Sequence, residues 1–546
     1  MIKMKKVTFA RIGALILVLA MLFVLVSCDK PGTEQPQRTT NPQQTTAPGE
    51  PTGSDSASTT GKENTEKSDE TIVIMLAAEP TTLTGLTGIT DQVACIVEYA
   101  IGGHLFEFNR EKGDVDFSLA ESYEVIDELH YRIKLRDDIH YTDGTPVTAA
   151  DVVYTVSCCI DGKQDWTNNM DIENFVIEDD RTLVVAYSKY TPGWAVAFAE
   201  ASAAIYSEAS VQAVGGLDKT ERNAPLGCGR YNAVEWKAGE YILLERNENY
   251  WDKSYNGYYK YIKLMWSSDA ASRLLAVKSG DAQVADTISI SEAVTLQNDP
   301  NTQAVLFNSG ATFMVYFNCS KGVFTDPKLR EAVSYAIDSE GINQVVNMGL
   351  GTVAQGFVPA SNKYYHEYHK GGINPYDPEK AKQLMKEAGY GDGLAIECKC
   401  LRGMVPAATL VQESLRQLGI TMEILPMDPG GFVPEARAGN YDLTIGNTDN
   451  SYIKPDNFNL VRPNFEVIGG PKITDPAMTE ILSRATSSNP EIEAQGWYDV
   501  IEYIFDNHCL VGLYNKLVCH ASSRDIEGLD LIKRDYLNIT KLRPVR

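Results

Sequence analysis

Two kinds of hydrophobic pattern recur along residues 71–546 and predict a mixture of strands and helices. Short β-branched or alternating runs favour strands, because successive side chains of a strand point to opposite faces. Apolar residues three or four positions apart favour helices. The expected strands are 71–76, 131–135, 183–187, 241–247, 313–318 and 510–514. The expected helices are 94–105, 271–279, 327–338 and 378–388. No regular strand–helix–strand period joins them, which favours an α/β body of several lobes over one doubly wound sheet or a barrel.

Local signals mark where some of these helices begin and end. Thr148 is suited to an N-cap, and Asp151 three residues later completes a pattern that resembles a capping box. Asp377 followed by Pro378 predicts a second helix start, and Gly389 predicts the end of that helix.

The N-terminus carries a different pattern. Residues 1–11 contain four basic and no acidic residues, and residues 12–26 form an unbroken apolar run. This run has the length of a signal-peptide core and is too short to span a bilayer as a stable helix. The junction before Cys28 resembles the lipobox of bacterial lipoproteins, which makes residues 1–27 a signal peptide and Cys28 the lipidated first residue of the mature chain. The alternative is an ordinary secretory signal in which Cys28 has no role.

A polar tether is expected from residue 28 to residue 70. Residues 29–70 contain no Ile, Leu, Val, Met, Phe, Tyr or Trp. Such a segment cannot bury enough apolar surface to offset the entropy lost on ordering, so we expect disorder. As a coil it would reach roughly 35 Å, enough to hold a domain away from a lipid surface.

The charge excludes some classes of partner. The formal net charge is −24, and removal of the signal peptide makes it more negative by four. An acidic chain lacks the basic face that nucleic acid requires, and it does not favour peripheral binding to anionic lipid. The 476 residues from 71 to 546 are too many for one simple core, which predicts two or three lobes.

Candidate catalytic and metal-binding groups are few. There is no Cys-x-x-Cys pair, phosphate-binding loop or Gly-x-Ser-x-Gly elbow. His366 and His369 are close enough in sequence to share a metal, but they lie in a polar stretch that favours a loop. We therefore expect no metal, no cofactor and no enzymatic activity. Nine cysteines follow Cys28, and most lie in apolar contexts typical of buried free thiols.

Five ordered blocks carry a family resemblance. They are residues 141–152, 227–251, 329–338, 376–390 and 438–458. Together they closely resemble the family 5 extracellular solute-binding proteins of ABC importers, the oligopeptide- and dipeptide-binding group. Five blocks in order are far more specific than any single short motif.

The resemblance implies a periplasmic-binding-protein-like α/β fold in which two lobes close on a ligand and a third domain is inserted. By analogy, lobe I is discontinuous and comprises residues 71–107, 210–308 and 515–546. The inserted domain II comprises residues 108–209, and lobe III comprises residues 309–514.

The resemblance also implies the position of the ligand. In peptide-binding relatives an aspartate holds the ammonium group of the ligand, and Asp449 is the matching position, with Asn447 and Asn450 beside it. A buried ammonium needs such a partner because its desolvation is costly. The alternative is that Asp449 only caps a loop. Tyr316 and Phe357 are further pocket candidates, placed by their neighbourhoods.

Relatives often carry Gly-Trp where this chain has Gly446-Asn447, so an aromatic wall of the site is missing. The expected function is nevertheless a monomeric, lipid-anchored protein on the extracellular face of the membrane, which captures a short peptide and delivers it to an ABC permease. An oligosaccharide or another small solute is the alternative within the family. A secreted hydrolase is the alternative from another class, and a sensory receptor for signalling peptides also stays open.

Overall fold

The computed structural model describes most of the chain that follows the predicted tether. The described residues are 68–88, 91–109, 111–254, 257–354, 375–449, 470–532 and 536–545. The predicted signal peptide, Cys28 and nearly all of the predicted tether lie outside them. Among the helices of the described residues, none is long and apolar enough to cross a membrane.

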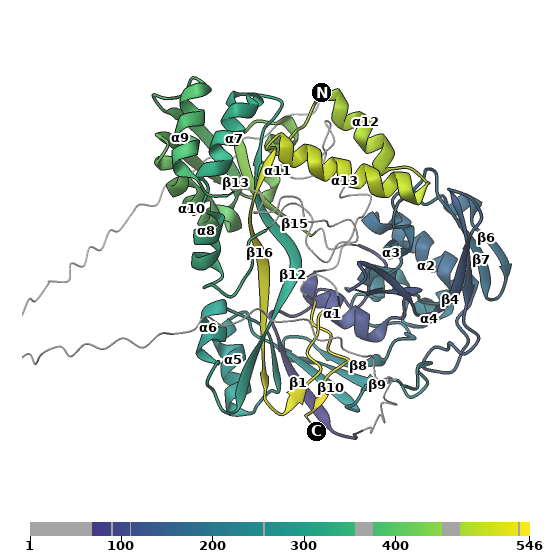
Figure 1. The fold of residues 1–546 in the computed structure, drawn as a ribbon. Helices are drawn as coiled ribbons and strands as arrows, with labels where there is room; N and C mark the ends of the chain where they lie inside the picture. The colour runs from purple at the N-terminus through teal and green to yellow at the C-terminus, as the bar shows by residue number, and fades with distance from the viewer. Residues whose placement is uncertain are drawn as a thin grey trace, which may run out of the picture. The chain divides into compact units, whose positions relative to one another are not determined.

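One ten-stranded sheet organises the fold, in the strand order β14-β13-β15-β12-β16-β11-β1-β10-β9-β8 (Figure 1). We call β11, β1, β10, β9 and β8 the first half of the sheet, and β14, β13 and β15 the second half. The ten strands are β1 (Thr71–Leu76), β8 (Tyr231–Lys237), β9 (Tyr241–Arg246), β10 (Tyr261–Trp266), β11 (Val284–Ile288), β12 (Thr302–Phe317), β13 (Leu394–Leu401), β14 (Ile420–Met427), β15 (Leu443–Asp449) and β16 (Leu510–Ser523).

Two long strands, β12 and β16, join the halves and run antiparallel, side by side, teal and yellow in Figure 1. Their pairing is interrupted between Asn308 and Thr312, where β12 has extra residues opposite β16. Gly310 lies in this interruption with φ +85°, a left-handed conformation that other residues adopt at a cost. The predicted boundaries between lobes I and III, at 308/309 and 514/515, fall within these two strands.

The helices pack on both faces of the sheet. They are α1 (Gln92–Ile101), α5 (Ala270–Ser279), α6 (Ile290–Thr295), α7 (Pro327–Ala336), α8 (Ser339–Val346), α9 (Pro378–Glu387), α10 (Val405–Arg416), α11 (Pro429–Ala438), α12 (Pro476–Ala485) and α13 (Pro490–Asp506). The C-terminal part of β12 is buried on both sides. Val315 and Phe317 join a core with α7 and α10, while Met314 and Tyr316 join a core with α12 and α13.

A second, four-stranded sheet with the order β4-β5-β7-β6 lies within the segment predicted as the insertion. Tyr131 and Trp194 stack in its core with ring centroids 4.2 Å apart. The strands of this sheet are β4 (Ala120–Val125), β5 (His130–Leu135), β6 (Val176–Asp179) and β7 (Thr182–Ala186), and the helices of the same segment are α2 (Ala149–Asp161) and α3 (Trp194–Ala197). The remaining elements are the pairs β2 (Phe106–Asn109) with β3 (Asp114–Phe117) and β17 (Ile526–Glu527) with β18 (Arg543–Pro544), and α4 (Glu208–Ala213).

The glycine-rich block at 227–231 has a packing role. A Cβ on Gly227 would lie 2.0 Å from the carbonyl oxygen of Ile101, and a Cβ on Gly229 would lie 2.6 Å from the Ile101 carbonyl carbon. Glycine is therefore required at both positions because the chain passes directly against the end of α1. This block of the family resemblance positions the backbone.

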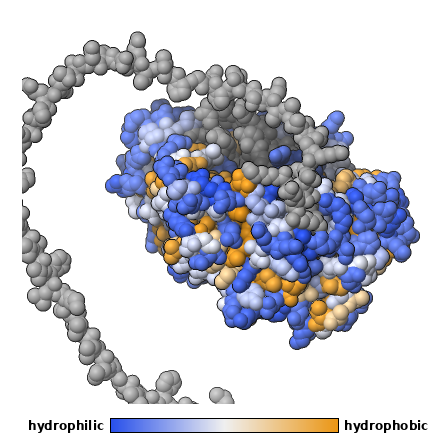
Figure 2. Space-filling view, turned by 90° about the horizontal axis from the view of Figure 1, so that it is seen from below, coloured by the Kyte–Doolittle hydropathy of each residue, from blue (hydrophilic) through white to orange (hydrophobic). Residues whose placement is uncertain are grey.

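One face of the surface can be compared with the polar composition of the chain. The face shown in Figure 2 is mostly hydrophilic, and hydrophobic residues interrupt it in small groups. Singly exposed hydrophobic side chains are usual on proteins and carry no functional conclusion.

Candidate functional site

The predicted ligand-reading segment is part of strand β15. Leu443 and Ile445 are buried and fix the register of β15 against β12, and the strand continues outward to the exposed Asn447. Asn447 lies opposite Phe313, and the backbone of Asp449 lies opposite Ala311. Ala311 follows Gly310 directly, so the end of β15 lies beside the interruption in β12, where the two halves of the sheet meet.

The other predicted site residues are placed differently. Tyr316 is only 1% exposed and is enclosed by the core that β12 shares with α12 and α13. A Cβ on Gly446 would lie 3.1 Å from its ring, so the tyrosine packs tightly under β15. Its role as a ligand contact stays a prediction. Phe357 and Asn450 lie outside the described residues.

Buried hydroxyls lie on the face of β12 and β15 that Tyr316 shares. Thr312 and Thr444 are each 1% exposed, and Oγ1 of each has no hydrogen-bond partner among the described residues. Buried polar atoms of this kind usually bind water or another polar group. The sequence offered no signal for this pair, because the two threonines are far apart in the chain and come together only through strand pairing.

A connected polar network holds the loop that follows β1. Asp91 caps α1 by accepting from the Ala94 N–H at 2.9 Å, and it accepts from the Thr81 N–H at 2.8 Å. Burial raises the pKa of Asp91, but the hydrogen bonds from Thr81 and Ala94 outweigh this and lower it. Gln164, from the segment predicted as the insertion, donates to the carbonyl oxygens of Gly85 and Gly88.

Glu98 of α1 lies beneath this loop and is 1% exposed. Its Oε1 accepts from the Gly85 N–H at 2.6 Å. Burial raises the pKa of Glu98 well above its usual value, and the hydrogen bond from Gly85 only partly opposes this. Glu98 Oε2, Thr84 Oγ1 and Tyr206 Oη are buried without a partner among the described residues. The loop after β1 therefore rests on a carboxyl group that favours its neutral form.

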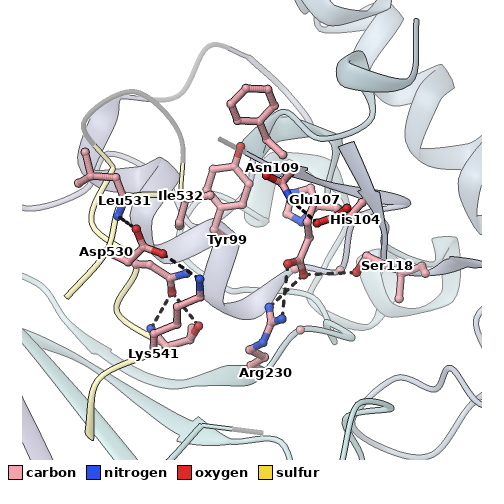
Figure 3. A pocket seen from close by; sticks show the side chains of 18 of the residues that line it. Tyr99, His104, Glu107, Asn109, Ser118, Arg230, Asp530, Leu531, Ile532 and Lys541 are labelled. Atoms are coloured by element: carbon pink, nitrogen blue, oxygen red, sulfur yellow. Dashed lines mark hydrogen bonds and ion pairs between the residues drawn. The ribbon is translucent and has the colours of Figure 1, made fainter. Parts of the chain in front are cut away.

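A separate polar cavity of about 530 Å³ lies beside the C-terminal end of α1 (Figure 3). Arg230 donates from Nη1 to Glu107 Oε1 at 3.1 Å on one wall, and Lys541 pairs with Asp530 at 2.8 Å on another. Desolvation raises the pKa of Glu107, but the charge of Arg230 and its hydrogen bonds outweigh it and lower the pKa. The charges that line this cavity are thus largely paired with one another.

The aromatic side chains of the cavity are held by a ring contact and a hydrogen bond. The ring of Tyr99 lies 4.9 Å from that of His104, whose Nε2 donates to the Ala201 carbonyl at 3.1 Å. Burial lowers the pKa of His104, which keeps the imidazole neutral. Ser118 donates to Glu107 Oε1 at 3.3 Å, and the same carboxylate accepts from Arg230. Fixed polar groups of this kind suit the binding of a polar ligand group.

Strand pairing separates this cavity from the end of β15. Strand pairing aligns the starts of three strands: Thr71 of β1, Tyr261 of β10 and Tyr231 of β8. Arg230 directly precedes Tyr231, so the cavity lies at the amino end of β1. β16 comes from the second half of the sheet and first pairs with β11 at Ile288, the carboxyl end of β11. The second half therefore lies beyond the carboxyl ends of β1 and β11, on the opposite side from the cavity.

Metal binding finds no support among the described residues, since none of their His, Cys, Asp and Glu side chains form a group of three able to hold an ion. The candidate pair His366 and His369 lies outside the described residues. Sequence reasoning missed the cavity because its lining comes from the end of α1, the β2–β3 hairpin, Arg230 and the C-terminal segment.

A family model described as bacterial extracellular solute-binding proteins, family 5 Middle, matches residues 115–461. The chain belongs to this family. It is also similar to the glutathione-binding protein GsiB of Escherichia coli K12, with 29% identity over 325 residues. GsiB of Salmonella typhi is 28% identical over the same length. These matches cover 57% of this chain and 61% of the relatives, less than two thirds of their length.

Solved structures show the same fold at lower identity. HbpA2 from Haemophilus parasuis aligns with a TM-score of 0.77 and 20% identity, over 87% of this chain and 100% of that chain. NikA from Brucella suis in complex with Fe(III)-EDTA aligns with a TM-score of 0.75 and 19% identity, over 87% and 100% of the chains. The oligopeptide-binding protein AppA from Bacillus subtilis, in complex with a nonapeptide, aligns with a TM-score of 0.66 and 22% identity, over 88% of this chain and 100% of that chain.

The predicted family and the periplasmic-binding-protein-like α/β fold are confirmed. The lobe boundaries and the assignment of Asp449, Asn447, Asn450, Tyr316 and Phe357 to the ligand site stay predictions.

Proposed function

We propose that this family 5 protein is an extracellular, lipid-anchored receptor that captures a short peptide between two lobes and delivers it to an ABC permease. The observation that carries the proposal is the course of β15, which leads from the core of the second half to the junction of the two halves. There it presents the exposed Asn447 and ends at Asp449. Capture is reversible binding, with no bond made or broken, and ATP hydrolysis belongs to other subunits.

The chemistry of a peptide fits such a position. A peptide zwitterion enclosed between lobes needs a partner for its ammonium, and a carboxylate provides short, charge-assisted hydrogen bonds. Backbone groups at a strand end can bind the peptide main chain without reading its side chains. Among the similar proteins, GsiB is named for glutathione, itself a short peptide, and AppA was solved with a nonapeptide.

Closure of the lobes is supported by the way the halves are joined. Two adjacent strands cross the junction, and the interruption between Asn308 and Thr312 leaves residues of β12 without ladder partners on β16. Such a place can bend while the flanking pairs keep their hydrogen bonds. The anchor rests on the sequence alone: the basic and apolar residues 1–27, Cys28 and the polar residues to 70.

The first experiment is native mass spectrometry of residues 71–546 purified gently from peptide-rich medium. A distribution of bound masses that fragments into peptides would support the proposed substrate. A single discrete non-peptide mass would contradict it and would point to an oligosaccharide or another solute.

A substitution tests the ammonium partner. Asp449→Ala should weaken peptide affinity by more than about tenfold, the loss expected when a charge-assisted contact disappears. Asp449→Asn keeps the size and removes the charge, so it should show a similar loss in calorimetry. Asp506→Asn, an exposed carboxylate on α13, is the matched control for a change of one charge. Equal affinity of Asp449→Ala and the wild type would remove Asp449 from the site.

A further inference from the structure

Two cysteines lie together at the base of the second half of the sheet. Cys319 follows the end of β12, and Cys509 precedes the start of β16. The Phe317 N–H donates to the Cys509 carbonyl at 3.3 Å, and the Cys319 thiol lies 3.7 Å from the Phe317 carbonyl oxygen. Burial raises the pKa of Tyr503 on α13, both cysteines add to this rise, and a side-chain hydrogen bond joins the two thiols. The two strand ends thus bring together residues that are 190 positions apart in sequence.

Exposure distinguishes this pair from the other cysteines. Of the nine cysteines among the described residues, Cys319 is partly exposed and the other eight are buried. Cys509 is 1% exposed. The pair therefore combines a partly exposed cysteine with a buried one, an arrangement typical of an attacking and a resolving cysteine.

We propose that Cys319 and Cys509 form a reversible disulfide that closes segment 320–508 at its base. The bond would cross-link the ends of β12 and β16, the two strands that join the halves of the sheet. The end of β15 pairs with Ala311, eight residues before Cys319 in the sequence, so the bond would not involve it.

The reaction is thiol–disulfide exchange with an external disulfide. The Cys319 thiolate attacks one sulfur of that disulfide, its S–S bond breaks, and a thiolate leaves. The Cys509 thiolate then attacks Sγ of Cys319, forms the Cys319–Cys509 bond and releases the second thiolate. The two protons lost by the cysteines pass to the two leaving thiolates, and the external disulfide is reduced by two electrons.

The electrostatics of the pair favour this order. The hydrogen bond from Cys509 and the charge of Arg330 lower the pKa of Cys319. The hydrogen bond to Cys319 and burial raise the pKa of Cys509 well above its usual value. Arg330 is held in place, because its guanidinium donates to the Asn507 carbonyl at 2.9 Å and to the Phe324 carbonyl at 2.7 Å.

The chain offers an internal comparison in Cys398 and Cys400. These thiols also contact each other, but both are fully buried and lie two residues apart on the same strand, β13. Two residues of a strand are about 6.6 Å apart with parallel side chains, which is close to the limit for a disulfide. We expect this pair to remain reduced.

The test is a peptide map of the intact chain after incubation with oxidised glutathione, followed by denaturation and alkylation of the remaining thiols. We expect a cross-linked peptide that contains Cys319 and Cys509 and disappears with dithiothreitol, while Cys398 and Cys400 are both alkylated. Thermal unfolding of the oxidised protein should shift down by about 3–5 °C on reduction, because the bond closes a loop of roughly 190 residues.

Variants sharpen the result. Cys319→Ser should abolish both the cross-link and the thermal shift, whereas Cys398→Ser should keep them. Alkylation of both Cys319 and Cys509 in the oxidised sample would overturn the proposal, and so would Cys319 found only as its glutathione adduct. The peptide map of the wild-type protein tests the proposal even if a variant does not fold. Because the experiment supplies the oxidant itself, its outcome is independent of export and of peptide binding.

Discussion

Relative to the wild type, Glu98→Gln should become more stable as the pH rises, although the substitution removes an acidic side chain. Glutamine keeps the size of the residue and keeps an oxygen that can accept from the Gly85 N–H. It cannot ionise. Its amide group also supplies a donor in the region of two buried hydroxyls, Tyr206 Oη and Thr84 Oγ1, that lack a partner among the described residues.

The direction follows from linkage between ionisation and folding. Burial raises the pKa of folded Glu98 well above 4.5, so the folded carboxyl stays neutral while the unfolded one ionises from about pH 4.5 upward. The stability contributed by this group is therefore complete below pH 4.5 and is lost as the pH rises toward the folded pKa. In that window the wild type loses about 1.4 kcal/mol per pH unit relative to Glu98→Gln.

This slope can be converted to a melting temperature. The roughly 480 residues from Glu63 to Arg546 correspond to an unfolding entropy of about 1 kcal/mol/K. The advantage of Glu98→Gln should thus grow by about 1.4 °C per pH unit for as long as folded Glu98 keeps its proton. Differential scanning calorimetry between about pH 4.5 and pH 7 measures it, and Glu502→Gln, an exposed residue of α13, controls for the lost carboxylate. A difference between Glu98→Gln and wild type that does not change with pH would refute the reasoning.

Two further predictions concern the contact between lobes and the anchor. Tyr190, from the segment predicted as the insertion, donates to Glu493 of α13 at 3.4 Å. Tyr190→Phe removes this hydrogen bond and should favour separation of that segment from α13 by about two- to tenfold. Distances between labels on α2 and α13 would measure the separation, and an unchanged distance distribution would contradict the prediction. Cys28→Ala should release the protein from the membrane fraction into the medium, as seen by fractionation and immunoblotting, and persistent membrane association would count against lipidation at this residue.

Local signals in the sequence were the most reliable guide to the fold. Asp377 caps α9 and Pro378 begins it, as predicted, because both effects act within one helical turn. The capping box is also present, with Asp151 accepting from the Thr148 N–H at 2.8 Å. The helix predicted over 327–338 instead ends at Ala336, and α8 begins at Ser339 with Asp338 as its N-cap.

Long-range pairing explains what the sequence could not show. The expected strand at 313–318 is the end of β12, which begins at Thr302. Asn308, Ser309 and Gly310 resemble a turn in sequence, but pairing with β16 on both sides of them keeps the strand continuous. Likewise, the strand pairing that brings the end of β15 to the junction of the halves depends on Ala311, more than a hundred residues away.

The position of β16 in the middle of the sheet has a consequence for how the protein is made. β16 lies between β12 and β11, although it is the last strand of the large sheet in the sequence. The sheet therefore cannot be completed until residues near 523 are available, and most of its central contacts span long stretches of chain. Folding with so many distant contacts is slow. If the chain is exported unfolded, as the proposed function implies, this delay is an advantage, because the two halves cannot be joined before the C-terminal region has followed.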